Sequence, residues 1–225
     1  MKNSPVGHYI VAIDGVSGSG KSSTARTVAK ELGILHLDTG AMYRAVTYLA
    51  LRSRIASNRV SDLTQMVSAL NWNIDSKGKL TVDGLDLSGE IRGPEVSASV
   101  SDYAKIPEMR QILVEVQRVI GNRQSSVVEG RDMATVVFPL ARFKFFMSAS
   151  PEVRAKRRVM ELQSLGLPGD YGQVLHNLAE RDAKDSGRVH SPLMIAVDSI
   201  EIDTSGLTFE KQVAIIVRHV LNNLP

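Results

Sequence analysis

A glycine-rich stretch near the start of the chain has the residue types and the spacing of a phosphate-binding loop. Residues 15–22 form a complete G-x-x-x-x-G-K-S motif. Glycines let the backbone turn tightly, so that consecutive N–H groups can point at phosphate oxygens. In this motif Lys21 reaches the β- and γ-phosphates and the hydroxyl of Ser22 binds Mg²⁺. The residues predicted to bind a nucleoside triphosphate are Gly15, Val16, Ser17, Gly18, Ser19, Gly20, Lys21, Ser22 and Ser23.

The residues on either side of this loop predict the strand and the helix that position it. Residues 9–13 are a short apolar run rich in β-branched side chains, which is typical of a buried strand. Residues 23–32 carry an apolar helical face of Ala25, Val28, Ala29 and Leu32, and the N-terminus of such a helix attracts phosphate. This context favours a working phosphate-binding loop over a glycine-rich turn without a function.

Polar residues also follow two other predicted strands. The strand predicted at 34–37 ends at Asp38, and a helix to about residue 54 follows, with Thr39 as its N-cap. The strand predicted at 126–129 is followed by Arg131 and Asp132. Open α/β sheets bind ligands outside the carboxyl ends of their strands, so these residues should converge with the phosphate-binding loop. Tyr43 and Arg44 at the helix start could then meet a phosphorylated ligand, although alone they indicate a capped surface helix.

Two basic helices follow a fourth strand predicted at 142–147. The first starts at Ser150-Pro151, runs to about residue 164, and carries three arginines on one face, Arg154, Arg157 and Arg158. This face is either solvated or belongs to a lid that closes over the transferring phosphate. The break at 165–169 precedes a helix capped by Asp170. That helix presents Arg181 and Asp185, and a helix end at Ser186-Gly187 would free Arg188; a surface salt-bridge ladder is the alternative.

The remaining chain completes an α/β pattern. Residues 61–107 combine a short helix with three short strand-like pieces, separated by turn sequences at Ser76-Lys77-Gly78 and Asp83-Gly84. We predict one domain over residues 1–225, with a five-stranded parallel sheet and helices on both faces. A small antiparallel insertion at 61–107 forms a mobile subdomain, and a helical lid occupies 151–169. Residues 107–123 and 208–224 are predicted as amphipathic helices, and 200–202 as the fifth strand.

Composition excludes several classes of protein. The chain of 225 residues is 43% hydrophobic, which allows a sizeable core, and its net charge is only +3. It has no cysteine, so disulfides and zinc–thiolate sites are excluded, and its five histidines show no metal-ligand spacing. No apolar run approaches the roughly 20 residues of a membrane span, and no secretory signal layout is present. We therefore expect a cytoplasmic protein without membrane contact. Aromatic residues make up 5% and are not interleaved with basic ones, which disfavours nucleic-acid binding.

Taken together, these motifs resemble bacterial cytidylate kinases of the long type, which contain an inserted subdomain that binds the nucleoside monophosphate. The resemblance runs nearly end to end and is far more specific than any single motif. Besides the phosphate-binding loop, it is carried by residues 38–44, 88–92, 130–139 and 181–188. The family implies a P-loop NTPase fold, ATP and Mg²⁺, and the reaction ATP + CMP → ADP + CDP, with dCMP as a second substrate. It implies small-molecule substrates and a monomer.

The resemblance also implies roles for individual residues. In such kinases the positions of Thr39, Tyr43 and Arg44 hold the acceptor phosphate, with Arg131 as a further phosphate contact. Ser101, Arg110 and Asp132 match positions that read the cytosine edge, Arg188 approaches the base, and Arg181 and Asp185 lie near the sugar. Arg154, Arg157 and Arg158 match lid positions, Arg157 on the ATP side. The residues expected to carry catalysis are Lys21, Arg131, Arg154 and Arg158, with no covalent nucleophile.

The sequence differs from the family pattern at two positions, and it leaves several alternative functions undecided. Val16 stands where the family commonly has proline, and Ala134 where it commonly has glycine. Val16 should leave ATP binding intact, whereas Ala134 needs a negative φ to avoid strain. The nearest rival is a kinase for UMP or shikimate. A second is a P-loop ATPase or switch acting on a partner, for which Glu129 and Asp132 give an ambiguous acidic residue after the strand.

Overall fold

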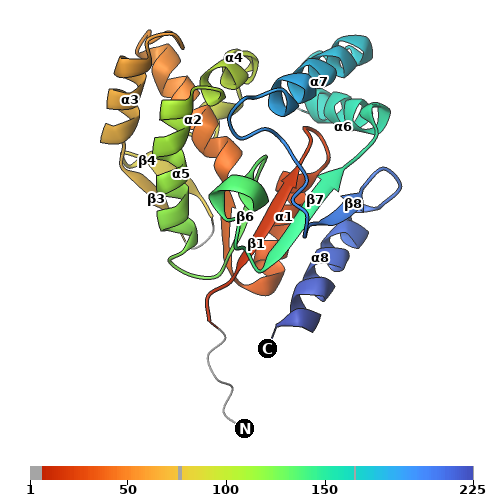
Figure 1. Cartoon of the computed structure of the whole chain (residues 1–225). Coiled ribbons are helices and arrows are strands. Elements are labelled where there is room, and N and C mark those ends of the chain that lie inside the picture. Colours follow the sequence, from red (N-terminus) through yellow and green to blue (C-terminus); the bar gives the residue numbers. More distant parts are fainter. Residues whose placement is uncertain (1–6, 76–77, 165, 225) are drawn as a thin grey trace.

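The computed structural model describes residues 7–75, 78–164 and 166–224, and its centre is a sheet of five parallel strands (Figure 1). The order across the sheet is β2-β6-β1-β7-β8, so the chain builds one side of β1 first and then crosses to the other. This confirms the predicted parallel sheet. The strands are β1 (Ile10–Gly15), β2 (Leu35–Asp38), β6 (Ser126–Gly130), β7 (Phe143–Ser148) and β8 (Ile200–Asp203).

All five strands point the same way, and their carboxyl ends meet at one edge of the sheet. In the register, Asp38 lies beside Glu129 and Gly15 beside Met147. β1 and β6 are buried along almost their whole length, because helices cover both sides, and this explains their apolar sequences. The loops that follow the strands all leave from this edge, where a sheet of this kind binds its ligands.

Helices cover both faces of the sheet, as predicted. One face packs against α1 and α8, with Val28 and Ile216 among the buried contacts. The other face packs against α2, α3 and α5, with Val46 and Leu113 in the cluster. These two apolar layers hold the sheet rigid and so fix the loops at its carboxyl edge. The helices are α1 (Lys21–Leu32), α8 (Phe209–Asn223), α2 (Thr39–Arg52), α3 (Val60–Ala69) and α5 (Pro107–Gly121).

The predicted antiparallel sheet is present between α3 and α5. It consists of β3 (Trp72–Ile74), β4 (Leu80–Val82) and β5 (Leu85–Asp86), followed by the 3-10 turn η1 (Glu90–Arg92) and α4 (Pro94–Ala104). Val82 and Ile91 pack on Ala41 and Ala45 of α2, so this insertion leans on the helix that follows β2. Asp83 and Gly84 have positive φ and form the predicted turn. Ser76 and Lys77, part of the other predicted turn, lie outside the described residues.

Two further helices form a hairpin above the carboxyl edge (Figure 1). α6 (Pro151–Ser164) and α7 (Tyr171–Ser186) pack through Ala155, Val174 and Leu178. Both predicted caps are confirmed: the Ser150 hydroxyl accepts from the N–H of Val153 at 3.3 Å, and Asp170 accepts from the N–H of Gln173 at 2.7 Å. α7 ends at Ser186, so Arg188 leaves the helix as predicted. Leu165, in the predicted break, is outside the described residues.

One local prediction is wrong, because Thr39 does not cap α2. The cap is Asp38, whose carboxylate accepts from the N–H of Ala41 at 2.8 Å. The Thr39 hydroxyl donates instead to the backbone carbonyl of Glu129 at 2.6 Å, on the neighbouring strand β6. Either side chain can cap a helix, and the tertiary partner on β6 decides between them.

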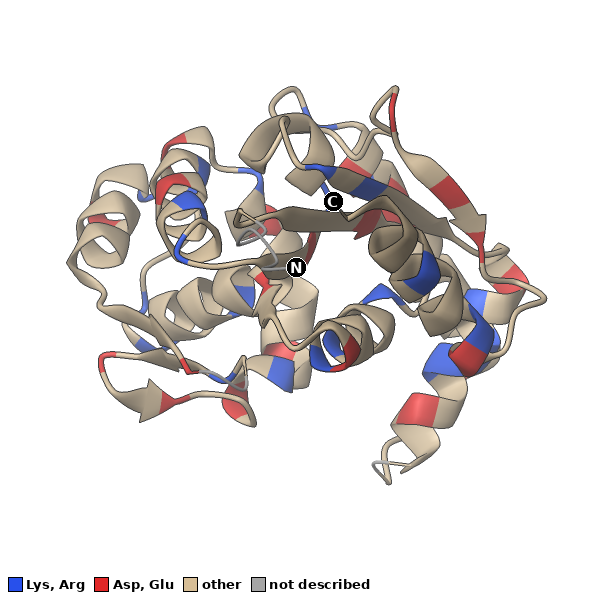
Figure 2. Ribbon diagram, turned by 90° about the horizontal axis from the view of Figure 1, so that it is seen from below, with Lys and Arg blue, Asp and Glu red and all other residues tan. Residues whose placement is uncertain are grey.

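The outer surface carries charges of both signs. Seen from below, acidic and basic residues are interspersed over the outer helices rather than gathered by sign (Figure 2). Among the helices that the structure describes, none is both long and apolar enough to cross a membrane.

Candidate active site

The loop after β1 adopts a conformation that requires its glycines. Gly18 and Gly20 have φ of 77° and 90°, in the region that favours glycine. A Cβ on Gly15 would lie 2.1 Å from the carbonyl oxygen of Met147, so only glycine lets β1 leave the sheet beside β7. Gly20 is also the N-cap of α1, so the loop feeds directly into a helix N-terminus, where phosphate binds.

Lys21 lies beneath this loop and is buried. Its Nζ donates to the carbonyl oxygen of Val16 at 3.4 Å. Burial, followed by the charge of Arg131, lowers the pKa of Lys21 to about 7, while the carboxylate of Glu129 acts in the opposite direction. A lysine held this way gains a full positive charge most readily when an anion sits beside it.

Ser22 is joined to a buried carboxylate on the neighbouring strand. Its hydroxyl donates to Oε2 of Glu129 at 2.5 Å, and Oε1 of the same carboxylate lies 3.1 Å from Nε2 of His36. Glu129, left undecided by the sequence, is therefore the acidic residue next to the loop, whereas Asp132 points elsewhere. Hydroxyl and carboxylate oxygens suit Mg²⁺, so the residues present fit that ion.

A cluster of arginines stands beside the loop, around the buried Asp185. Asp185 accepts from Nε of Arg131 at 2.7 Å and from the guanidinium of Arg188. Burial alone would raise the pKa of Asp185, but the Arg131 and Arg188 guanidiniums hold it below its usual value. Asp185 is 2% exposed, so the surface salt-bridge ladder considered from sequence is wrong here.

Two further arginines in this cluster keep unused donors. The Nε atoms of Arg181 and Arg44 are buried and have no hydrogen-bond partner. Burial, followed by the charge of Arg131, lowers the pKa of Arg181 to about 10, and Arg44 acts in the same direction. Because Arg131 and Arg181 both depress the pKa of Lys21, the structure brings these predicted residues together. The cluster has more positive than negative charge close to a phosphate-binding loop.

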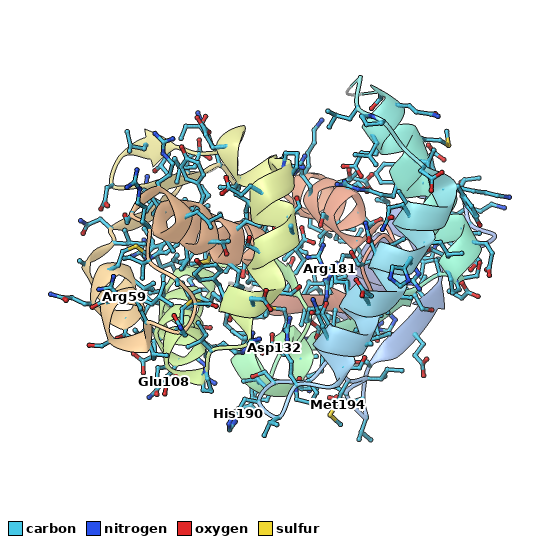
Figure 3. All side chains as sticks on the ribbon, turned by 90° about the horizontal axis from the view of Figure 1, so that it is seen from above. Arg59, Glu108, Asp132, Arg181, His190 and Met194 are labelled. Atoms are coloured by element: carbon cyan, nitrogen blue, oxygen red, sulfur yellow. The ribbon has the colours of Figure 1, made fainter. Side chains whose placement is uncertain are left out.

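Beyond the arginine cluster lies a buried pair. The guanidinium of Arg110 donates to Asp132 and, at 3.1 Å, to the carbonyl oxygen of Ala104. Arg110 also lies 5.1 Å from the ring centroid of Tyr43, whose pKa burial raises to about 12. Figure 3 shows Asp132 and Arg181 in the central region between α4 and α7. Ser101 is half-buried on α4.

Of the three arginines of α6, two contact the phosphate-binding loop and one pairs within its own helix. Arg154 donates to the carbonyl oxygen of Ser17 at 3.1 Å and to Asp182 at 2.5 Å, and Arg157 donates to that of Ser19 at 3.3 Å. Arg158 instead pairs with Glu161 at 2.7 Å on the surface. The structure therefore brings Arg154 and Arg157 to the phosphate-binding loop, whereas the Arg158 guanidinium pairs on its own helix.

Sequence reasoning missed the residue that supports the turn after β6. Both carboxylate oxygens of Asp14 accept at 2.8 Å, one from the N–H of Met133 and one from that of Ala134. These bonds fix the π-helical turn η2 (Met133–Val137) next to Asp132. Ala134 has no positive φ, so alanine is unstrained at this position. An acidic residue at the end of a buried strand could have pointed to such a role.

The pKa of Asp14 gives a test of this support. Burial raises the pKa of Asp14 to about 6, against the two N–H donors that lower it. The protonated form therefore stabilises the fold below about pH 4, and this contribution is lost as pH rises through 6. Relative to Asp14→Asn, the wild-type free energy of unfolding should fall by about 2 kcal/mol from pH 4 to 7 in urea titrations. A constant difference would contradict this.

The chain is similar in sequence to known cytidylate kinases. A family model described as cytidylate kinase matches residues 11–222. The chain is 44% identical to the cytidylate kinase of Clostridioides difficile, over 96% of this chain and 99% of that one. It is also 44% identical to the cytidylate kinase of Clostridium tetani, over 91% of this chain and 90% of that one. Among solved structures, an uncharacterized protein from Eubacterium ventriosum aligns with a TM-score of 0.52 and 14% identity, over 96% of this chain and 99% of that one. At this low identity the likeness supports the fold alone.

Proposed function

The chain belongs to the cytidylate kinase family, and we propose that it carries out ATP-dependent phosphorylation of CMP with residues at the carboxyl edge of its sheet. It is a nucleoside monophosphate kinase, a phosphotransferase. The observation that carries the assignment of residues is the pair of buried, unpartnered Nε donors on Arg44 and Arg181, close to Lys21. Buried donors of this kind need an acceptor, and CMP supplies phosphate oxygens for Arg44 and sugar oxygens for Arg181.

The donor nucleotide lies, in our proposal, on the loop of residues 15–22. Lys21 neutralises the β- and γ-phosphates, whose charge restores its pKa. Mg²⁺, when bound through Ser22, supplies further charge neutralisation at these phosphates. Arg154 and Arg157 hold the loop itself through the carbonyl oxygens of Ser17 and Ser19.

The acceptor lies between the arginine cluster and the Arg110–Asp132 pair. Arg44 and Arg131 bind its phosphate, with Thr39 and Tyr43 beside them; Arg181 and Asp185 contact the sugar. A phosphate oxygen of CMP attacks the γ-phosphorus, the new O–P bond forms, and the bond to the β–γ bridging oxygen breaks to release ADP. Charge neutralisation and alignment suffice for this chemistry, so the residues act by position.

Cytosine recognition is assigned to Arg110, Asp132, Arg188 and Ser101. Cytosine offers an amino donor where uracil has a carbonyl, and an acidic acceptor distinguishes them. Asp132→Ala should therefore lower the ratio of kcat/KM for CMP over UMP at least tenfold. Asp102→Ala, which removes an exposed carboxylate paired with Lys105 at the C-cap of α4, is the control. An unchanged ratio would place base recognition elsewhere.

The assay that tests the function is ADP release with CMP, dCMP, UMP, AMP and shikimate side by side. We expect CMP to give the highest kcat/KM and dCMP to be accepted. A preference for UMP or shikimate would favour the rival kinases, and acceptor-independent hydrolysis would favour an ATPase or switch.

We further propose that the enzyme acts as a cytoplasmic monomer in pyrimidine nucleotide metabolism. Small-molecule substrates and a chain without cysteine support this setting. Sedimentation with and without CMP tests the monomer, and the proposal fails if a dimer persists at micromolar concentration.

A further inference from the structure

A buried hydrogen-bonded chain links His36 on β2 to the phosphate-binding loop. Nε2 of His36 lies 3.1 Å from Oε1 of Glu129, and Oε2 of the same carboxylate accepts from the Ser22 hydroxyl at 2.5 Å. The side chains of His36 and Glu129 are 6% and 2% exposed. An ionised carboxylate can only accept, so a hydrogen bond between the two side chains requires the Nε2–H tautomer of His36. Each oxygen of Glu129 is thus held by one donor.

The orientation of the Ser22 hydroxyl follows from this chain. When the hydroxyl donates to Glu129, its proton points away from the nucleotide and its lone pairs remain free to bind a cation. The backbone of Glu129 is held as well, because its carbonyl oxygen accepts from Thr39 at 2.6 Å. His36 is the remaining partner that fixes the carboxylate itself.

The insertion covers His36 from outside. A Cβ on Gly78, before β4, would lie 3.0 Å from the carbonyl oxygen of His36 and 3.1 Å from its Cβ. Gly78 has φ of 78°, which favours glycine, and a side chain there would be tight against β2. This contact encloses His36, and a buried, enclosed hydrogen bond orients its partner better than an exposed one.

We propose that His36 is a positioning residue, which holds Glu129 so that the Ser22 hydroxyl presents its lone pairs to Mg²⁺. This inference rests on the proposed function, since it concerns the same donor site. Residues that orient a metal ligand through a hydrogen bond commonly change metal affinity or activity by 10- to 100-fold when replaced. His36 touches neither nucleotide nor metal and acts only through Glu129.

The test compares two side chains of nearly equal length. His36→Gln keeps an N–H donor for Glu129, whereas His36→Met removes the donor and keeps the volume. For His36→Met we expect kcat to fall about tenfold or more, with less than a twofold change in KM for CMP. His36→Gln should stay within about threefold of wild type. His176→Met, which replaces an exposed histidine 3.5 Å from Glu180, is the control.

A second readout does not depend on turnover. By calorimetry without CMP, His36→Met should bind ATP about tenfold more weakly in Mg²⁺ and unchanged in EDTA, and His36→Gln should bind normally in both. Equal behaviour of the two variants, or an equal loss with and without Mg²⁺, overturns the proposal. If His36→Met does not fold, NMR of the wild-type ring decides: an Nε2–H tautomer supports the proposal and an Nδ1–H tautomer overturns it. The binding data stand even if CMP proves not to be the acceptor.

Discussion

Lys21→Met is expected to lower turnover by about a thousandfold while leaving the affinity for CMP nearly unchanged. Methionine has a similar length and no charge, so the loop keeps its shape but loses the cation that we propose to meet the β- and γ-phosphates. Removing one preorganised group of this kind typically costs a factor of 100 to 1,000 in kcat. ADP release measures the turnover, and calorimetry with CMP alone measures the acceptor affinity.

A measurement of folding stability shows whether the loss of turnover in Lys21→Met comes from unfolding. Burial already lowers the pKa of Lys21 to about 7, so a neutral side chain there should not destabilise the fold. Lys30→Met, at the exposed end of the same helix, is the matched control and should behave like wild type. Turnover of Lys21→Met within threefold of wild type would refute the assigned role.

Asp185→Ala is expected to damage both stability and CMP binding. Asp185 is buried between Arg131 and Arg188, and its removal leaves two guanidiniums without their shared anion. Breaking a buried ion pair from one side costs about 3–5 kcal/mol. We expect a loss of that size in urea unfolding at pH 7, and an increase of about 100-fold in the KM for CMP, because both arginines lose their position.

The stability that Asp185 contributes should depend on pH in a definite direction. The folded pKa of Asp185 lies below its usual 3.8, so the stability it supplies is present above that pH and is lost in acid. The difference between wild type and Asp185→Ala should therefore shrink as the pH falls below 4. Asp198→Ala, which removes an exposed carboxylate from a pair with Lys144, is the control for charge removal. Equal unfolding curves for wild type and Asp185→Ala would contradict the prediction.

Local patterns were enough to predict most elements. The strand–loop–helix around Lys21 is specified by neighbouring residues, because an apolar run, three glycines and an apolar helical face follow one another. The caps Ser150 and Asp170 are also local, and both are confirmed. The convergence of Arg44 and Arg131 with the phosphate-binding loop followed from the rule that loops after parallel strands share one edge. Arg181 lies on a helix, and its place at this site was expected only from the family resemblance.

Contacts between distant segments could not be predicted. Thr39 and Asp38 are both good capping residues, and the choice depends on a carbonyl oxygen of β6, 90 positions away. The helical period placed the arginines of α6 on one face but could not show that Arg154 donates to the carbonyl of Ser17. Nothing near His36 in sequence indicates its bond to Glu129, since that bond exists only because β2 and β6 are neighbours.

The region that we propose for the acceptor contains two buried carboxylates. Asp185 and Asp132 occupy guanidinium donors of Arg131, Arg188 and Arg110. A small inorganic ion must compete with these carboxylates and has no sugar or base to compensate for the ion pairs it disrupts. We therefore expect sulfate or orthophosphate at millimolar concentration to inhibit only weakly. The site would then bind a complete nucleotide in preference to abundant simple anions.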